Sequence, residues 1–383
     1  MTDRHILRGR GFVAGAIHDD VVVVIEEGRF ADVRLVVRNT DPEPNVGGGL
    51  MVPGFIDLHV HGAAGADFMD GDAEATRQVC AAHLREGTTA LAATTLSGSR
   101  ESIADALRAA FAVAAEPGAE EAAIVGVNLE GPYLSPAKAG AQDPASLRAA
   151  SVEEVEFWRS LGPEGMPWIM TVAPEVDGVL ALIAAFRDRI CFSIGHTSAD
   201  FAQTTRALEA GARHMTHLFN AMPPLHHRDP GPIGAAALDE HCSVELIADG
   251  IHLHPSILRM MAELFSDRAA LVTDAMRACG LSEGTYKLYR HEVRVSEGAA
   301  RLADGTLAGS VLTMRQAVRN MVELAGVPIE AVLPFATEVP ARILGIDGAR
   351  GWLAAGYEAD LVVLSDELEI LKIFCRGNEV SQK

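Results

Sequence analysis

Apolar runs alternate with amphipathic stretches through the middle of the chain. Apolar and β-branched runs are typical of buried strands, whereas stretches rich in Ala, Leu, Glu and Arg favour helices. The strands predicted in this way are Phe55–His61, Thr88–Thr95, Ile124–Glu130, Trp168–Pro174, Ile190–His196, His214–Asn220, Val244–Asp249 and Ala270–Asp274. The helices predicted between them include Ala73–Glu86, Glu101–Ala115, Val152–Leu161, Val176–Arg187, Phe201–Ala210 and Ser256–Leu264. This alternation predicts an α/β protein with a (β/α)8 TIM-like barrel. An open doubly wound sheet is the alternative, although no dinucleotide-type glycine fingerprint follows the first strand.

The two ends of the chain have a different pattern. Short β-branched runs punctuated by glycine and proline predict β-structure at both ends, as in Val21–Ile25, Val33–Val37 and Ile370–Phe374. We therefore expect a small β-sandwich domain built from residues 1–52 and 351–383, and a catalytic barrel over residues 53–350. A β-hairpin insertion is predicted at residues 281–307, followed by a helix at Met314–Ala325.

Composition narrows the class of protein. The 383 residues are 49% hydrophobic, which is enough for a large core, and their formal net charge of −20 argues against nucleic-acid or anionic-membrane binding. No long uncharged apolar run predicts a membrane span, and the start of the chain lacks a secretory pattern. Five scattered cysteines indicate reduced thiols in the cytoplasm. An anionic substrate would need a local cationic pocket.

His59 and His61 carry the strongest chemical signal. They lie at the end of the first predicted barrel strand, and residues two apart in a strand point to the same side. Two imidazoles directed at one point suit a metal ion. Two solvated or core histidines are the alternative for an isolated His-x-His.

Other potential metal ligands follow at the ends of further strands, namely Glu130, His196, His217 and Asp274. The carboxyl ends of barrel strands share one mouth, so these side chains are expected to converge with the histidine pair on a divalent ion such as zinc. Each of them alone could be structural. His226, His227, His252 and His254 lie in loops at the same mouth and are candidates for substrate contact, whereas His214 is expected to face away.

These motifs resemble the amidohydrolase superfamily, which opens with a run like Val52–Gly62. Further motifs are similar to its N-acetylglucosamine-6-phosphate deacetylase branch: 129–133, 195–197, 217–224, 248–252, 273–276, 307–310 and 359–364. The resemblance covers nearly the whole chain in order. It implies hydrolysis of the acetamide of a phosphorylated N-acetyl amino sugar, with the glucosamine derivative ahead of the galactosamine epimer.

The resemblance also implies roles for single residues. Glu130, His196 and His217 would hold the main metal, and His59 and His61 could hold a second with Glu130 bridging. Zinc is expected, with iron or another metal as alternatives and one or two ions per subunit. Asp274 would take a proton from the attacking water and deliver it to the leaving amine. Substrate contacts are expected from Asn220, Ala221, Arg228 and His252, and the family implies a homodimer in which a neighbour supplies a phosphate ligand.

One position departs from the family pattern. Gln142 stands in the run Gly140–Pro144, where members commonly carry a histidine that hydrogen-bonds the acetyl carbonyl. A glutamine amide can donate a hydrogen bond but cannot carry positive charge. Oxyanion stabilisation is therefore weaker here, or the substrate differs. Other N-acyl or cyclic amides remain an alternative, as does a non-catalytic barrel, which would predict a degraded set of ligands.

Overall fold

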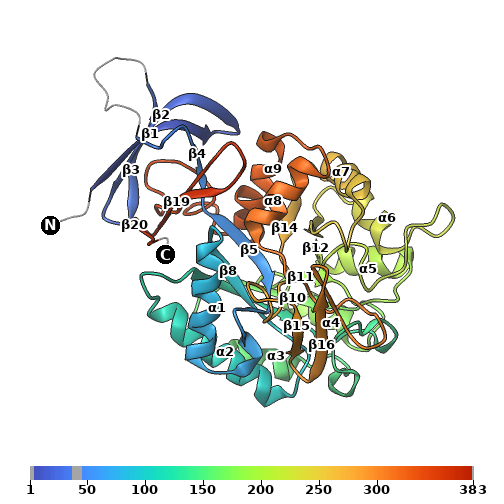
Figure 1. The fold of residues 1–383 in the computed structure, drawn as a ribbon. Coiled ribbons are helices and arrows are strands. Elements are labelled where there is room, and N and C mark those ends of the chain that lie inside the picture. Colours follow the sequence, from blue (N-terminus) through green and yellow to red (C-terminus); the bar gives the residue numbers. More distant parts are fainter. Residues whose placement is uncertain (1–3, 37–44, 382–383) are drawn as a thin grey trace.

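The computed structural model describes residues 4–36 and 45–381, which form a barrel surrounded by helices and a smaller sheet (Figure 1). The barrel has eight parallel strands in chain order. They are β5 (Phe55–Val60), β8 (Thr88–Thr95), β9 (Ala123–Glu130), β10 (Trp168–Val172), β11 (Cys191–Ile194), β12 (His214–Met215), β13 (Ser243–Ile247) and β14 (Ala269–Val272). The ring closes where the Asp274 N–H donates to the His59 carbonyl at 2.8 Å. The predicted (β/α)8 barrel is confirmed.

Helices cover the outside of the barrel (Figure 1). Within the described residues they are α1 (Ala73–Arg85), α2 (Arg100–Ala115), α3 (Val152–Arg159), α4 (Val179–Phe186), α5 (Phe201–Ala210), α6 (Gly231–Leu238), α7 (Pro255–Leu264), α8 (Met314–Glu323), α9 (Ile329–Ala336) and α10 (Glu338–Leu344). Several start at a capping side chain; at α2, Ser99 Oγ accepts from the Ser102 N–H at 3.1 Å. The predicted helices did not include α6, α9 and α10. Pro334 lies inside α9, Pro340 lies in the short α10, and Gly231 and Gly234 weaken the helical pattern of α6.

The sixth barrel strand is shorter than predicted. The strand expected over His214–Asn220 ends at Met215, so that prediction was wrong in length. Beyond it, the backbone is left-handed at His217, Phe219 and Ala221, with φ of 29°, 79° and 51°. Left-handed non-glycine residues cannot continue a strand. The chain turns here instead, which directs His217 into the barrel mouth.

Strands from both chain ends form one seven-stranded sheet, in the order β20-β19-β18-β4-β1-β2-β3. Its strands are β1 (His5–Val13), β2 (Ala16–Glu26), β3 (Arg29–Leu35), β4 (Leu50–Pro53), β18 (Leu361–Leu364), β19 (Ile370–Cys375) and β20 (Asn378–Glu379). Successive residues face opposite sides: Leu361 and Val363 join the core of this sheet, whereas Val362 and Leu364 join the barrel core. Val37, the end of one predicted run, lies outside the described residues.

The predicted hairpin insertion is present as a three-stranded sheet of β15 (Gly284–Leu288), β16 (His291–Ser296) and β17 (Ala299–Arg301). Smaller elements are β6 (Gly62–Ala63), β7 (Ala66–Asp67) and the 3-10 helices η1 (Phe68–Asp70), η2 (Pro136–Lys138) and η3 (Pro144–Ser146). Among the described residues, no helix combines the length and apolar character needed to cross a membrane.

Candidate metal centre and active site

The barrel brings all the predicted ligand-type residues to the carboxyl ends of its strands. His59 lies on β5 and Glu130 ends β9, while the other residues follow the ends of their strands by one or two positions. All are buried: His59, His61, Glu130, His196, His217 and Asp274. The backbone is left-handed at His196, His217 and Asp274. Strained backbone of this kind concentrates at functional sites, where the fold holds a side chain in a required direction.

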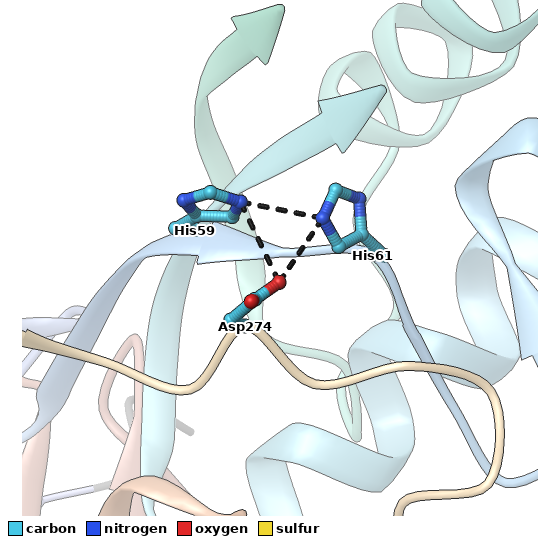
Figure 2. A group of neighbouring side chains, drawn as sticks. All are labelled: His59, His61 and Asp274. Atoms are coloured by element: carbon cyan, nitrogen blue, oxygen red, sulfur yellow. Dashed lines mark hydrogen bonds and ion pairs between the residues drawn. The ribbon is translucent and has the colours of Figure 1, made fainter. Parts of the chain in front are cut away.

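One group of three side chains forms around the end of β5. Figure 2 shows the His59 and His61 rings pointing toward the Asp274 carboxylate. The two Nε2 atoms are 3.3 Å apart, and Asp274 Oδ1 lies 3.2 Å from His61 Nε2 and 3.6 Å from His59 Nε2. Three potential ligand atoms thus face one small volume, as a bound cation requires.

A second group consists of Glu130, His196 and His217. Glu130 Oε1 lies 3.0 Å from His196 Nε2 and 3.1 Å from His217 Nε2, and the two nitrogens are 3.0 Å apart. The other oxygen of Glu130 is 3.3 Å from His61 Nε2, which connects this group to the first. Imidazole nitrogens and a carboxylate form the donor set that zinc prefers.

The charges in these groups are strongly coupled. Burial lowers the pKa of His61, but the carboxylates of Asp274 and Glu130 outweigh burial and raise that pKa to about 9. Burial raises the pKa of Glu130, yet the charges of His59 and His196 hold it well below its usual range. Ionised carboxylates thus face imidazoles that attract protons, and a divalent cation can replace those protons. The residues present therefore fit a metal ion.

Glu245, which the sequence analysis missed, supports both groups. Its Oε2 lies 2.9 Å from His59 Nδ1 and accepts a hydrogen bond from the His217 N–H at 2.9 Å. Its Oε1 lies 3.1 Å from His214 Nε2. A carboxylate on the far nitrogen of a ligating histidine fixes the tautomer and the ring orientation. The signal in the sequence was a lone acid within the apolar run of β13.

Above the two groups lies a cavity of about 520 Å³. Four predicted substrate contacts line it: Gln142, Asn220, Ala221 and His252. His252 is oriented by Asp249, whose Oδ2 lies 2.6 Å from its Nδ1.

The predicted phosphate contact Arg228 is not brought to this cavity within one chain. It lies in an exposed loop, where its Nη1 is 2.7 Å from His227 Nε2. Two other cations do line the cavity, Lys138 and Arg301. Neither was predicted from the sequence. The insertion that carries Arg301 lies far along the chain from the strands it approaches, and Lys138 lies in the loop after β9, beyond the strand end.

Comparisons with known proteins agree with this geometry. The amidohydrolase family matches residues 50–380 of the chain. N-acetylglucosamine-6-phosphate deacetylase of Bacillus subtilis (strain 168) is 41% identical over 86% of this chain and 84% of its own length. N-acetylgalactosamine-6-phosphate deacetylase of Escherichia coli O157:H7 is 35% identical over 98% of this chain and 99% of its own length.

A solved structure shares the whole architecture. It is that of a mutant N-acetyl-D-glucosamine-6-phosphate deacetylase from Mycobacterium smegmatis in complex with N-acetyl-D-glucosamine-6-phosphate. It superposes with a TM-score of 0.93 at 34% identity and covers 99% of this chain and 100% of its own. The likeness thus includes both the barrel and the smaller sheet.

Proposed function

The chain belongs to the amidohydrolase family, and we propose that it is a metal-dependent deacetylase of amino-sugar catabolism. It hydrolyses the acetamide of N-acetylglucosamine 6-phosphate to glucosamine 6-phosphate and acetate. The observation that carries this function is the buried Glu130–His196–His217 group beneath a cavity with cationic side chains in its lining. Relatives with this activity in their names align over most of the chain.

Glu130, His196 and His217 would hold the main cation, for which zinc is the best match to two imidazoles and a carboxylate. When bound, this cation would activate a water molecule and polarise the acyl carbonyl. His59 and His61, with Asp274, form the group able to hold a second ion.

Asp274 moves the proton. Burial raises its pKa, but the hydrogen bond to His61 and the charges of His59 and His61 lower it below its usual value, so the carboxylate is ionised and can act as a base. Asp274 accepts a proton from the attacking water while the water oxygen bonds to the acyl carbon. It then gives that proton to the amine nitrogen as the carbon–nitrogen bond breaks, which releases acetate.

The substrate phosphate needs cationic and N–H donors. His252, Asn220 and Ala221 line the cavity. The imidazole of His252 and the backbone N–H of Ala221 supply some of these donors, whereas the Asn220 N–H already donates to the His217 carbonyl at 3.0 Å. Arg228 supplies a further one from the neighbouring subunit of a homodimer, which its position in an exposed loop of its own chain supports.

The enzyme is proposed to work in the cytoplasm, because all five cysteines are unpaired, as in proteins of reducing compartments. N-acetylgalactosamine 6-phosphate is the second candidate substrate, since a relative named for that activity aligns over nearly the whole chain.

Acetate release by the zinc-loaded protein tests this function. N-acetylglucosamine 6-phosphate is compared with its galactosamine epimer and with unphosphorylated N-acetylglucosamine, and Asp274→Asn serves as the inactive control. We expect fast release from the glucosamine phosphate and slow release from the unphosphorylated sugar. Equal rates with and without phosphate would contradict the proposed substrate, and no release from any of them would contradict the activity.

A further inference from the structure

The side-chain amide of Gln142 is held between two groups at the base of the cavity. Its Oε1 accepts a hydrogen bond from the Ser97 N–H at 2.7 Å, and its Nε2 donates to Glu130 Oε2 at 2.5 Å. A backbone N–H can only donate and an ionised carboxylate can only accept, so these partners permit one orientation of the amide. We infer that Gln142 is a positioning residue, which fixes the Glu130 carboxylate and so sets the affinity of the Glu130–His196–His217 group for a divalent cation.

The hydrogen bond from Gln142 separates the tasks of the two oxygens of Glu130. Oε2 receives the amide N–H, while Oε1 faces His196 Nε2 and His217 Nε2 at 3.0 and 3.1 Å. Gln142 and Glu130 are each only 3% exposed, so bulk water is a poor substitute for this donor. A ligating carboxylate that is itself hydrogen-bonded keeps its orientation as the cation binds and leaves.

Ser97 ties both parts of Glu130 to the end of β8. Its N–H holds the Gln142 amide, and its Oγ donates to the main-chain carbonyl of Glu130 at 3.3 Å. Ser97 therefore fixes the backbone of Glu130 directly and its side chain through Gln142. This closed loop of three residues explains why a glutamine, with one acceptor and one donor end, suits the position.

The segment that carries Gln142 also orients His196. The Lys138 carbonyl lies 2.8 Å from His196 Nδ1 and accepts its proton, which leaves Nε2 as the ligating nitrogen. Gly140 has a φ of 58°, and a Cβ there would lie 3.1 Å from His196 Cε1. The segment thus packs closely on two of the three predicted ligands of the main cation.

This role differs from contact with the acetyl carbonyl, which the family pattern implies for this position. The inference rests on the proposed function for its meaning, but its test does not depend on turnover. Zinc dissociation constants are measured for the full-length protein by competition with a chromophoric chelator, for wild type, Gln142→Met and Thr306→Ala. Methionine fills a similar volume without either hydrogen bond, and Thr306 lines the same cavity on the insertion side.

We expect zinc to bind about 10- to 100-fold more weakly to Gln142→Met, as is usual when an outer partner of a metal ligand is removed, and unchanged binding to Thr306→Ala. Excess zinc is expected to restore most of kcat in Gln142→Met. Unchanged zinc affinity, with kcat still low in excess zinc, would overturn the inference and favour a contact with the acyl group. Wild type that binds zinc tightly but releases no acetate would defeat the proposed function, and the affinity comparison would still decide the role of Gln142.

Discussion

At the scale of single residues, the carboxylate of Glu245 connects the two groups of potential ligands from beneath. Burial raises its pKa, but the charge of His59 and the hydrogen bond from His214 lower the pKa below the usual range, so Glu245 is ionised. This buried negative charge therefore has three partners: the ring of His59, the backbone N–H of His217, and the ring of His214, which faces away from the cavity. Its loss would leave these partners unsatisfied at once.

We expect Glu245→Ala to lower the free energy of unfolding by about 3 kcal/mol, because it removes one partner from a buried, charged network. Urea unfolding measures this change. Glu263→Ala, an exposed acid on α7, is the matched control and should change stability by less than about 0.5 kcal/mol. Equal stability of the two variants would show that the Glu245 network contributes little.

Asp274→Asn tests the proton transfer. The amide keeps an oxygen toward His61 but cannot accept a proton from water, so kcat should fall by about 10²- to 10⁴-fold. Zinc at the Glu130 group and substrate binding should persist, which metal analysis and the KM of the residual activity check. Near-normal kcat would remove Asp274 from the role of proton carrier.

At the scale of elements, the β15–β17 insertion completes the wall of the cavity. Arg301, at the end of β17, lines the cavity and is held by a hydrogen bond from its Nη1 to the Gly305 carbonyl at 2.9 Å. The remaining donors of its guanidinium suit a phosphate or sugar oxygen. In a chain with a net charge of −20, such a local cation matters for an anionic substrate.

Arg301→Ala is therefore expected to raise KM for N-acetylglucosamine 6-phosphate about tenfold, the usual cost of one charge-assisted hydrogen bond, with little change in kcat. Steady-state kinetics measure both, and Arg259→Ala on the exposed face of α7 is the control. An unchanged KM would show that Arg301 only closes its own turn.

Arg228→Ala tests the contribution expected from a neighbouring subunit. It should also raise KM for the phosphorylated sugar, because a phosphate oxygen would lose a donor from across the interface. The same kinetic assay measures this effect, and unphosphorylated N-acetylglucosamine is the control substrate. If KM did not change, Arg228 would have no part in the phosphate site.

The sequence predicted some of the site residues and strand bounds but not others. His59, Glu130 and the other ligand-type residues could be predicted as polar residues at the ends of apolar strands, because a parallel barrel places these strand ends together. That rule cannot find Glu245, which lies inside a strand, or Arg301, which a separate insertion delivers. It also overextended β12, since apolar residues continue after the backbone has turned. The place of Arg301 and the end of β12 depend on tertiary contacts that no local pattern encodes, whereas Glu245 is marked in the sequence only as a lone acid within an apolar run.

At the scale of the whole molecule, cation binding should stabilise the fold, because the ligands come from β5, β9 and the segments after β11, β12 and β14. Removal of metal by a chelator is expected to lower Tm, and added zinc to restore it. The restoring effect should weaken as pH falls. Burial lowers the pKa of His196, but the charge of Glu130 outweighs burial and raises that pKa above its usual value. Protons therefore compete with zinc for a nitrogen of the main group, and zinc affinity should rise with pH.

Calorimetric scans with and without zinc at several pH values measure both effects. The double variant His196→Ala/His217→Ala, which lacks two ligands of the main group, is the control and should respond only weakly to zinc. A Tm independent of metal, or a zinc effect that grows toward acid pH, would contradict this account of the site.

Because strands from both chain ends form the smaller sheet, this sheet cannot be completed until the end of synthesis. β4 pairs with β18, and β4 runs through Gly54 directly into β5, the strand that carries His59. On the ribosome, the edge of β4 that pairs with β18 stays open until the whole barrel, from β5 to β14, has been synthesised. The strand that pairs with this edge of β4, and so supports the start of β5, is therefore synthesised only after the barrel. A polypeptide released before Leu361 would leave the edge of β4 exposed to pairing with other chains.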